Sequence, residues 1–373
     1  MAYRLKTKRC LFFLLFFLIG LGEFCPIMAG QDTITLTDMA GRSVSVPREI
    51  KKVVPLGGAL RFMVYLQSLD LVAGMEHIEQ KWTSPGRLYG LATAKLAKKL
   101  PVIGEGGPGK LPDFEQIISV WPDVIVVMGI DDSQAITIQE RTGLPVFVLR
   151  YGTPGALDLN QVKEAIVLLG RLLGREQRAE ELTGYMNRLF TDLATRTKDA
   201  SVLKERPVYV GAISYKGTQG ITSTESGHLP LFWAGGQNVA DEIERPGHAF
   251  IDPEKLLHWN PEVIFLDAGS IATVAEDFRK NTDYYQKLKA IRQNQVYLTM
   301  PYNYYHTNIE IALADAYFMG TVLHPKQFAD IDPAVKADEI FRFFIGISAY
   351  DSLSGEFHGF GPIQFGDKDL ALP

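Results

Sequence analysis

The densest group of polar aromatic side chains lies in residues 301–306, Pro-Tyr-Asn-Tyr-Tyr-His. The group follows a predicted strand over 295–298 and precedes a predicted helix, and α/β folds bind ligands at such junctions. Tyrosine oxygen and histidine nitrogen can ligate iron or hydrogen-bond to a chelate, and the rings can pack on a flat ligand. We expect one or two of these side chains to contact a ligand and the others to fill an interface: Tyr302, Tyr304, Tyr305 and His306. Tyr305 and His306 are the candidate metal ligands.

A second candidate is the turn Gly57-Gly58-Ala59-Leu60-Arg61, where a predicted strand meets a predicted helix. Free backbone N–H groups at a helix N-terminus favour an anion, and Arg61 would add positive charge. We therefore predict that Gly58 and Arg61 bind an anionic ligand. The alternative is an ordinary strand–helix turn with an exposed arginine.

Two further candidates lie in the second half of the chain. Tyr215 follows a predicted strand over 207–214, in the position that corresponds to the Gly57–Arg61 turn. His248 lies in a predicted loop, and the alternative is a histidine that is simply exposed at the surface.

In the first half of the chain, Trp82 and Tyr89 could line a cleft. The remaining histidines are interpreted as structural, with His228 capping a helix: His77, His228, His258, His324 and His358.

A repeated segment indicates how these loops are positioned. Residues 113–127 align without a gap on residues 252–266, 139 positions later. In both copies an acidic cap opens a short helix, proline ends it, and an apolar run continues as a buried strand. A spacing this long does not fit a solenoid repeat of about 20–50 residues. It predicts two similar α/β lobes, and a cleft between lobes is a common ligand site.

The other elements agree with two lobes built on mostly parallel sheets. Residues 33–47 predict a hairpin, and strands are predicted over 52–56, 71–74, 124–128 and 144–149, with residues 101–103 leading into a glycine-rich loop. Residues 158–199 have helical spacing in two runs that meet at Gly174, contain no proline, and predict a stiff connector that restricts hinge motion. A helix of about fifteen residues is predicted from Asn308. We therefore expect a signal peptide at 1–29, lobes at 30–155 and 201–328, a helical spine at 156–200, and an extension at 329–373 packed on the second lobe.

The N-terminus predicts export. Four basic residues precede the apolar run 11–19, and small residues follow at 29–30, as in a cleaved secretory signal peptide. The run is too short to span a bilayer of ~30 Å. Both cysteines, Cys10 and Cys25, fall in this leader, so the mature protein would have no disulfide. Glu23 and Phe24 make Cys25 a poor lipidation site, which favours a soluble exported protein. A net charge of −5 gives no reason to expect nucleic acid as a partner.

Several strings, in this order, resemble class III periplasmic solute-binding proteins of ABC importers. They are Asp38-Met-Ala-Gly-Arg-Ser-Val-Ser-Val-Pro, Lys52-Val-Val-Pro-Leu-Gly, Gly104 followed by Phe114-Glu and Trp121-Pro-Asp-Val-Ile, and Asn308 to Leu323 before His-Pro. The resemblance covers residues 33–328. It implies two α/β lobes joined by a long rigid helix, with a ferric siderophore, haem, corrinoid, metal ion or oxyanion bound between them, and a monomer in the periplasm.

The resemblance also implies docking on a membrane permease, which works with ATPase subunits, through one acidic residue per lobe. At the matching position of each repeat copy stand Glu115 and Glu254. Pairing of such acids with basic residues favours orientation and on-rate more than affinity. The alternative is two first-turn glutamates that suit the helix dipole.

The leading function is thus a carrier of an iron complex, with no catalysis and no intrinsic cofactor. The sequence has no nucleophile elbow, zinc motif, P-loop or mature cysteine. Residues Gly104–Gly109 match the dinucleotide-binding fingerprint in residue type. Pro108, however, lies where that motif must begin a helix, so we interpret the segment as a loop at the edge of the cleft. Two alternatives remain open: a receptor for molybdate, tungstate or a free metal ion, and an exported metal-dependent hydrolase using His248 and His306. A metal-cluster scaffold is disfavoured because such clusters need thiolates.

Overall fold

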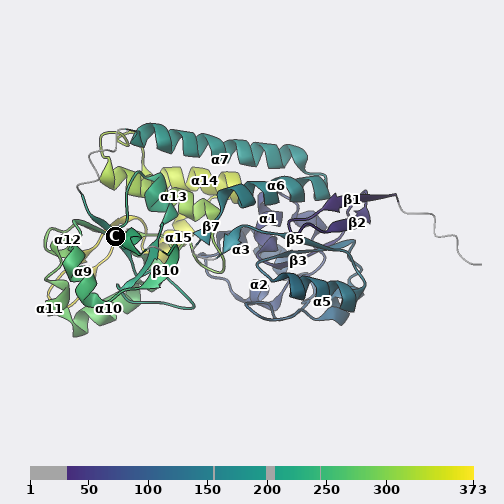
Figure 1. The fold of residues 1–373 in the computed structure, drawn as a ribbon, viewed down its shortest axis with the longest axis horizontal. Helices are drawn as coiled ribbons and strands as arrows, with labels where there is room; N and C mark the ends of the chain where they lie inside the picture. The colour runs from purple at the N-terminus through teal and green to yellow at the C-terminus, as the bar shows by residue number, and fades with distance from the viewer. Residues whose placement is uncertain (1–31, 154–155, 199–205, 244) are drawn as a thin grey trace, which may run out of the picture. The chain divides into compact units, whose positions relative to one another are not determined.

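A computed structural model describes residues 32–153, 156–198, 206–243 and 245–373. The chain from Thr33 to Pro373 forms one compact unit (Figure 1). The predicted signal peptide, with Cys10 and Cys25, lies outside the described residues. None of the helices in the described ranges is long and apolar enough to cross a membrane.

The first sheet is parallel. It contains β3 (Val53–Gly57), β4 (Val124–Met128) and β5 (Val146–Leu149) in that order. The strand expected over 71–74 is present only as a single parallel bridge from Val53 to Val72, and a second such bridge joins Met75 to Val102. Every residue of β4 and β5 is buried, as expected for parallel strands that are covered on both faces. The helices of this lobe are α1 (Ala59–Tyr65), α2 (His77–Lys81), α3 (Leu88–Ala97), α4 (Phe114–Ser119) and α5 (Asp132–Thr142).

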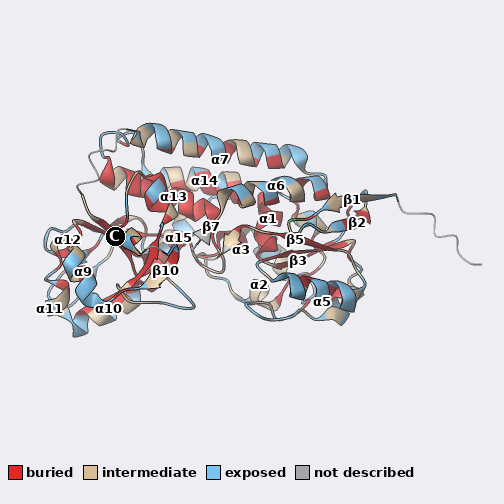
Figure 2. Ribbon diagram, in the orientation of Figure 1, coloured by how far each residue is buried: buried red, intermediate tan, exposed pale blue. Residues whose placement is uncertain are grey.

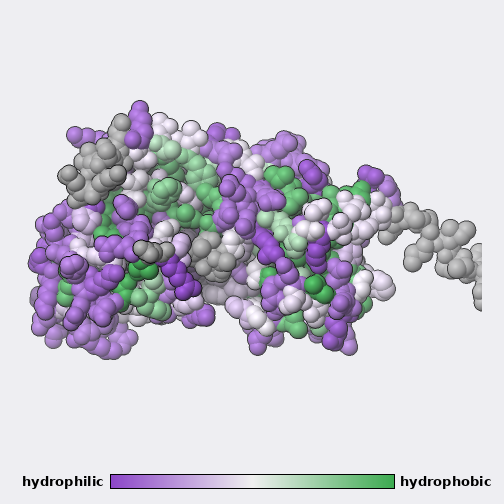
Figure 3. Space-filling model, viewed as in Figure 1, coloured by the Kyte–Doolittle hydropathy of each residue, from purple (hydrophilic) through white to green (hydrophobic). Residues whose placement is uncertain are grey.

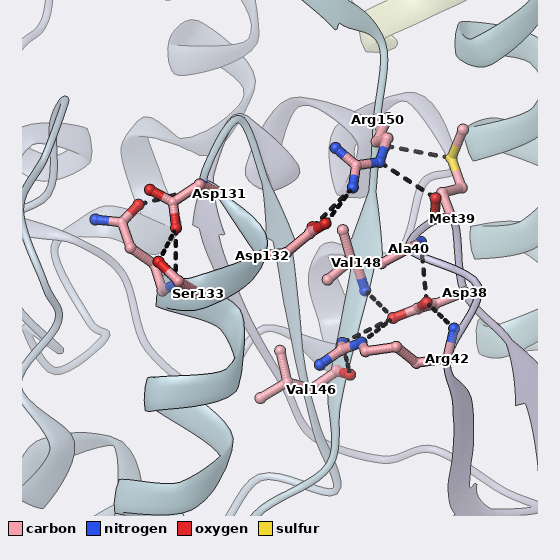
Figure 4. Close-up of polar contacts among 11 residues, drawn as sticks. Asp38, Met39, Ala40, Arg42, Asp131, Asp132, Ser133, Val146, Val148 and Arg150 are labelled. Atoms are coloured by element: carbon pink, nitrogen blue, oxygen red, sulfur yellow. Dashed lines mark hydrogen bonds and ion pairs between the residues drawn. The ribbon is translucent and has the colours of Figure 1, made fainter.

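An N-terminal hairpin of β1 (Thr33–Thr37) and β2 (Ser43–Pro47) is attached to this sheet through its turn. Asp38 accepts the backbone N–H of Arg42 at 2.9 Å and that of Val148, in β5, at 3.1 Å. Arg42 donates both to Asp38 and to the carbonyl of Val146 at 2.7 Å (Figure 4). Because Asp38 is buried, these bonds satisfy a carboxylate that would otherwise be costly to desolvate.

The connector is two helices, α6 (Leu159–Leu173) and α7 (Glu176–Thr197), and they pack side by side (Figure 1). The chain turns at Gly174, whose φ of +63° is the left-handed conformation that glycine tolerates best. Helix α7 bonds to elements before and after it in the chain: Arg178 donates to the carbonyls of Tyr65, at the end of α1, and of Phe343, in α14, and Arg196 pairs with Asp330. The predicted stiff helical connector is thus a helical hairpin, preceded by the short strands β6 (Gly152–Thr153) and β7 (Ala156–Leu157).

The second sheet has the order β10-β9-β8-β11-β12-β13. The central strands β8 (Val208–Gly211), β11 (Val263–Asp267) and β12 (Val296–Thr299) are parallel. The outer strands β9 (Ser223–Ser226), β10 (Gly247–Phe250) and β13 (Gly361–Pro362) pair antiparallel. The sequence Ser-Thr-Glu-Ser of β9 lacks apolar alternation, so periodicity did not predict this strand. Its hydroxyls satisfy buried carbonyls instead, as with Thr224 and Val210 at 2.6 Å.

Helix α13 (Ile309–Leu323) is buried along most of its length and packs on α14 (Pro333–Ile345) and α8 (Leu229–Trp233) (Figure 2). The other elements of this half are α9 (Pro253–Trp259), α10 (Ile271–Lys280), α11 (Thr282–Tyr285), α12 (Lys289–Arg292), α15 (Tyr350–Phe357), β14 (Gln364–Phe365) and β15 (Leu370–Ala371). Helix α14 also packs on α1 and α3, with the rings of Tyr65 and Phe344 5.1 Å apart. The C-terminal extension therefore contacts both lobes, whereas we expected contact with the second alone.

The two repeat copies fold alike. Asp113 caps α4 by accepting the Gln116 N–H at 3.1 Å, and Asp252 caps α9 by accepting the Glu254 N–H at 2.9 Å. Each helix leads into a fully buried strand, β4 or β11, in the interior of its sheet. The predicted α/β fold with two similar lobes is confirmed.

Candidate ligand-binding site

A buried arginine of the first lobe holds the aromatic loop of the second. Arg61 on α1 is 2% exposed. Its Nη1 donates to the carbonyl of Thr307 at 2.8 Å, and its Nη2 donates to the carbonyl of Tyr305 at 2.7 Å. The side-chain oxygen of Asn308 accepts a third bond at 3.2 Å. Loop 301–308 leaves the second sheet but is fixed to the first lobe.

A buried acidic residue, Glu310, lies near the positively charged Arg61. Glu310, in the first turn of α13, accepts a hydrogen bond from the hydroxyl of Tyr65. Burial raises the pKa of Glu310, and the Arg61 guanidinium opposes that rise. Arg61, predicted to face an anion, is instead enclosed by α1 and the aromatic loop with both Nη groups donating to protein oxygens. Gly58, which we expected to bind the same anion, is the N-cap residue of α1 and donates its N–H to the carbonyl of Met128 at 3.0 Å.

The loop places His306 against the ends of β3 and β4. Tyr305 and His306 have φ of +53° and +61°, a region that costs non-glycine residues energy. The Nδ1 atom of His306 lies 2.7 Å from the hydroxyl of Tyr151. A Cβ added to Gly129 would lie 2.6 Å from the imidazole. Glycine at 129 therefore makes room for the ring.

A pocket of about 140 Å³ lies at this edge of the first sheet. It is lined by the ends of β3 and β4, the glycine-rich loop 107–112, Glu76 and two residues of helix α5. Tyr305 and His306 are the loop residues that line it. The glycine-rich loop is therefore part of a cavity wall, as expected for a cleft-edge loop.

Sequence reasoning missed Glu76. Its side chain is 6% exposed and accepts the N–H of Gly57 at 2.8 Å. Burial raises the pKa of the Glu76 carboxyl to about 7, and nearby Glu79 adds to the rise. The available signal was an acidic residue directly after the predicted strand 71–74, at the sheet edge where ligands bind.

The two residues of the aromatic loop that line the pocket, Tyr305 and His306, are uncharged at neutral pH. Burial lowers the pKa of His306 to about 4, with a smaller contribution from Arg61, so the imidazole is uncharged at neutral pH. Burial raises the pKa of Tyr305, and its hydroxyl has no hydrogen-bond partner among the described residues. Over those residues, no cluster of three or more His, Cys, Asp and Glu could hold a metal ion. A metal ion bound here would need further ligands, either from Tyr305 or from small molecules that bind together with the metal.

Tyr302 and Tyr304 face elsewhere. The buried Tyr302 donates to Glu225 Oε1 at 2.7 Å. The ring of Tyr304 lies 5.0 Å from that of Trp82 and packs on Phe357. Neither residue lines the pocket. Contact with ligand stays a prediction for all four aromatic residues of the loop.

Tyr215 and His248 form a separate aromatic group. Their rings stack at 4.0 Å, and the Nε2 of His248 lies 2.8 Å from the hydroxyl of Ser223. Phe250, also missed, packs edge-on against His248 and is 61% exposed. Tyr215 follows β8, whereas His248, which we expected in a loop, lies in strand β10 with Phe250. None of the three lines the pocket. The group places exposed aromatic side chains on the second lobe, with Tyr215 38% and Phe250 61% exposed.

The predicted docking residues, Glu115 and Glu254, are exposed in the first turns of α4 and α9. Neither forms an ion pair with another described residue. In the view of Figure 3, hydrophilic residues dominate the surface over α9–α12. The first copy differs by exposing Ile118 and Trp121 beside its glutamate.

A family model described as periplasmic binding protein matches residues 87–302, more than half of the chain. The chain belongs to the periplasmic binding protein family. A curated relative from Bacillus subtilis (strain 168), YvrC, is described as an uncharacterized ABC transporter substrate-binding lipoprotein. It is 23% identical over 71% of this chain and 77% of its own.

Solved structures share the fold of this periplasmic binding protein. Haemophilus influenzae MolA bound to molybdate has a TM-score of 0.66 at 19% identity, covering 84% of this chain and 98% of its own. Veillonella parvula FepB, a TroA-like periplasmic binding protein, has a TM-score of 0.62 at 21% identity, covering 84% and 97%. A periplasmic heme binding protein from Pseudomonas aeruginosa has a TM-score of 0.51 at 18% identity, covering 74% and 94%. At these identities the likeness shows the fold alone.

Replacing Arg61 with methionine should lower the free energy of unfolding by about 3–5 kcal/mol, because it leaves the carbonyls of Tyr305 and Thr307 without their donor and removes the positive charge near the buried Glu310. The matched control is Arg150→Met, which removes a partly exposed pair with Asp132 worth about 0–1 kcal/mol. Urea denaturation measures both. Equal losses in the two variants would contradict the role given to Arg61.

The buried Glu225 should give stability a pH dependence. Burial raises the pKa of its carboxyl from 4.5 to about 8, so the folded state keeps a proton that the unfolded state releases. The free energy of unfolding should fall as pH rises from 4.5 to about 8, by at most about 1.4 kcal/mol per unit. In Glu225→Gln the fall should be shallower, while Asp267, with a pKa raised to about 6, keeps a residual slope. Denaturation curves across this range in both proteins measure it, and equal slopes would refute it.

Proposed function

We propose that this protein is the extracytoplasmic substrate-binding component of an ABC importer for a metal-containing solute. The observation that carries the proposal is the pocket at the carboxyl edge of β3 and β4, closed by Tyr305 and His306 from the second lobe. Open α/β sheets bind ligands at that edge. Because residues of both lobes line the site, a bound ligand can slightly change how the two lobes pack against each other.

The proteins with similar folds support a metal-containing ligand. They include a molybdate-bound protein, a protein of an Fe3+-hydroxamate transport system, a heme binding protein and a protein with Ni(II) bound. These ligands differ in size and charge but share a metal centre. The sequence favours an iron complex such as a ferric siderophore, haem or corrinoid, and imidazole and phenol groups suit iron.

The oxyanion alternative is a receptor for molybdate or tungstate. The TM-score of 0.66 to molybdate-bound MolA keeps it in consideration. In this chain, however, the predicted anion ligand Arg61 does not line the pocket. The hydrolase alternative has weaker support, because His248 and His306 do not share a pocket.

We propose that the leader at 1–29 exports the protein and that it acts as a soluble monomer outside the cytoplasm. YvrC is described as a lipoprotein, so lipidation of Cys25 is the alternative. The partners would be a dimeric permease and its ATPase subunits.

Native mass spectrometry with elemental analysis of protein purified from its own cell envelope tests the ligand class. We expect one metal-containing solute per chain. Visible absorbance then distinguishes a coloured iron chelate from a colourless oxyanion. A bound solute that contains no metal would contradict the proposal.

Docking is tested separately from binding. In proteoliposomes that contain the importer, changing both Glu115 and Glu254 to arginine should abolish stimulation of ATP hydrolysis, because like charges would then meet at the interface. Solute affinity should be unchanged. The control is Glu140→Arg, an exposed residue of α5 outside the repeat. Full stimulation by the double variant would rule out this docking surface.

A further inference from the structure

We propose that Trp121 and Ile118, which we call the α4 patch, bind the extracytoplasmic surface of the permease subunit that meets the first lobe. The inference rests on the proposed function and deepens it. The docking glutamates alone, Glu115 and Glu254, do not distinguish one lobe from the other. The α4 patch would make the contact of the first lobe mainly apolar and leave that of the second lobe mainly charged.

The patch exposes side chains that a folded protein often buries. Trp121 is 76% exposed, the largest fraction among the large apolar side chains of the described residues, and Ile118 is 38% exposed. Within that part of the chain, the side chain of Trp121 forms no ring contact and no hydrogen bond. Single exposed apolar residues are common on protein surfaces, so exposure alone does not assign a role. The internal repeat supplies the comparison that does.

The second copy of the repeat shows what the fold itself needs at this position. Trp121 aligns with Asn260, and both residues have a left-handed backbone, with φ of +52° and +42°. Asparagine adopts that conformation more readily than other non-glycine residues. The Oδ1 atom of Asn260 also accepts the backbone N–H of Lys289 at 2.9 Å. Trp121 adopts the same conformation without such a bond, so folding does not explain a tryptophan there.

The aromatic side chain of the second copy contacts its own lobe instead. Trp259, which aligns with Val120, donates from its indole nitrogen to Glu242 Oε2 at 2.8 Å. The centre of its ring lies 4.9 Å from the Nζ atom of Lys255. Hydrophilic residues dominate the surface over α9–α12 (Figure 3). The two copies therefore present different surfaces beside their glutamates.

The composition of the patch favours a protein partner that has an apolar hollow next to a basic residue. Tryptophan is enriched among the residues that carry most of the binding energy in protein interfaces. Glu115 precedes Ile118 by three positions, so the two side chains share one face of α4, and Glu115 is exposed. A permease that pairs a basic residue with Glu115 would bring its apolar hollow to Trp121. The ion pair would set the orientation, and burial of the indole ring would supply affinity.

Two other occupants fit the charges less well. Anionic membrane surfaces attract clusters of about four to eight basic residues, whereas α4 contains no basic residue. Its basic neighbours are single charges: Lys52 donates to the carbonyl of the C-cap residue at 3.2 Å, and Arg141 lies over the ring of Phe114. A two-fold contact between copies would bring the two Glu115 residues together without a basic residue of α4 to pair with them.

Proteoliposomes that contain the importer test the proposal through the concentration of this protein that gives half-maximal stimulation of ATP hydrolysis. Trp121→Asn should raise that concentration at least tenfold and leave the solute occupancy seen by native mass spectrometry unchanged. Its melting temperature should equal or exceed that of the wild type, because asparagine suits the left-handed backbone. The matched control is Phe232→Asn, which removes a side chain of α8 that is 70% exposed and should stimulate as the wild type does.

Photo-cross-linking in cells identifies what the patch touches. With p-benzoylphenylalanine in place of Trp121, we expect cross-links to a membrane-spanning subunit of the importer. Cross-links to lipid or to a second copy of this chain would overturn the proposal. So would half-maximal stimulation by Trp121→Asn at the wild-type concentration, or a lower melting temperature of that variant, which would assign the tryptophan a structural role.

The same assay separates this inference from the proposed function. If Trp121→Asn stimulates as the wild type does, while the variant with arginine at both Glu115 and Glu254 does not, only this inference fails. If the wild-type protein stimulates no ATP hydrolysis and carries no solute, the proposed function fails as well.

Discussion

The hydrogen bonds from Arg61 to the carbonyls of Thr307 and Tyr305 are the contacts on which the candidate site depends. They join a helix of the first lobe to a loop that leaves the second sheet. A guanidinium removed from water is costly unless its donors are satisfied, and here both Nη groups donate, to these two carbonyls and to the side-chain oxygen of Asn308. Glu310 and Tyr65 form a second buried polar contact beside it. The loop conformation and the lobe contact are therefore stabilised together.

This constraint explains how two consecutive non-glycine residues keep a left-handed backbone. Tyr305 and His306 would each lose energy in that conformation, and the bonds from Arg61 to both sides of His306 hold the chain there. The geometry directs the imidazole onto glycines at the ends of β3 and β4. The helical hairpin of α6 and α7, and α14 packed on both lobes, further restrict relative motion. A ligand would act on this site by local change in the loop more than by wide lobe opening.

The repeat, its helix caps and its buried strands were predictable because each depends on local rules: an acidic N-cap, a proline stop and an apolar run. The aromatic loop was also identified as a site candidate from residue type and position. The role of Arg61 was not predictable, because burial of its turn depends on a loop almost 250 residues later in the chain. Glu76 was missed for a related reason: only tertiary structure brings its carboxylate to the N–H of Gly57 and into the pocket that His306 also lines. Strand β9 was missed because polar residues form it and its hydroxyls are satisfied across the sheet.

X-ray diffraction from crystals of the protein loaded with the solute it carries from its own cell envelope would test this view of the site most directly. Anomalous scattering at the absorption edge of the bound metal locates that metal without assumptions about the surrounding chain. The account predicts a single strong peak at the edge of β3 and β4, beside His306, with the bonds from Arg61 to loop 301–308 intact. A peak at another surface, or a loaded state in which Arg61 has left the loop, would contradict it.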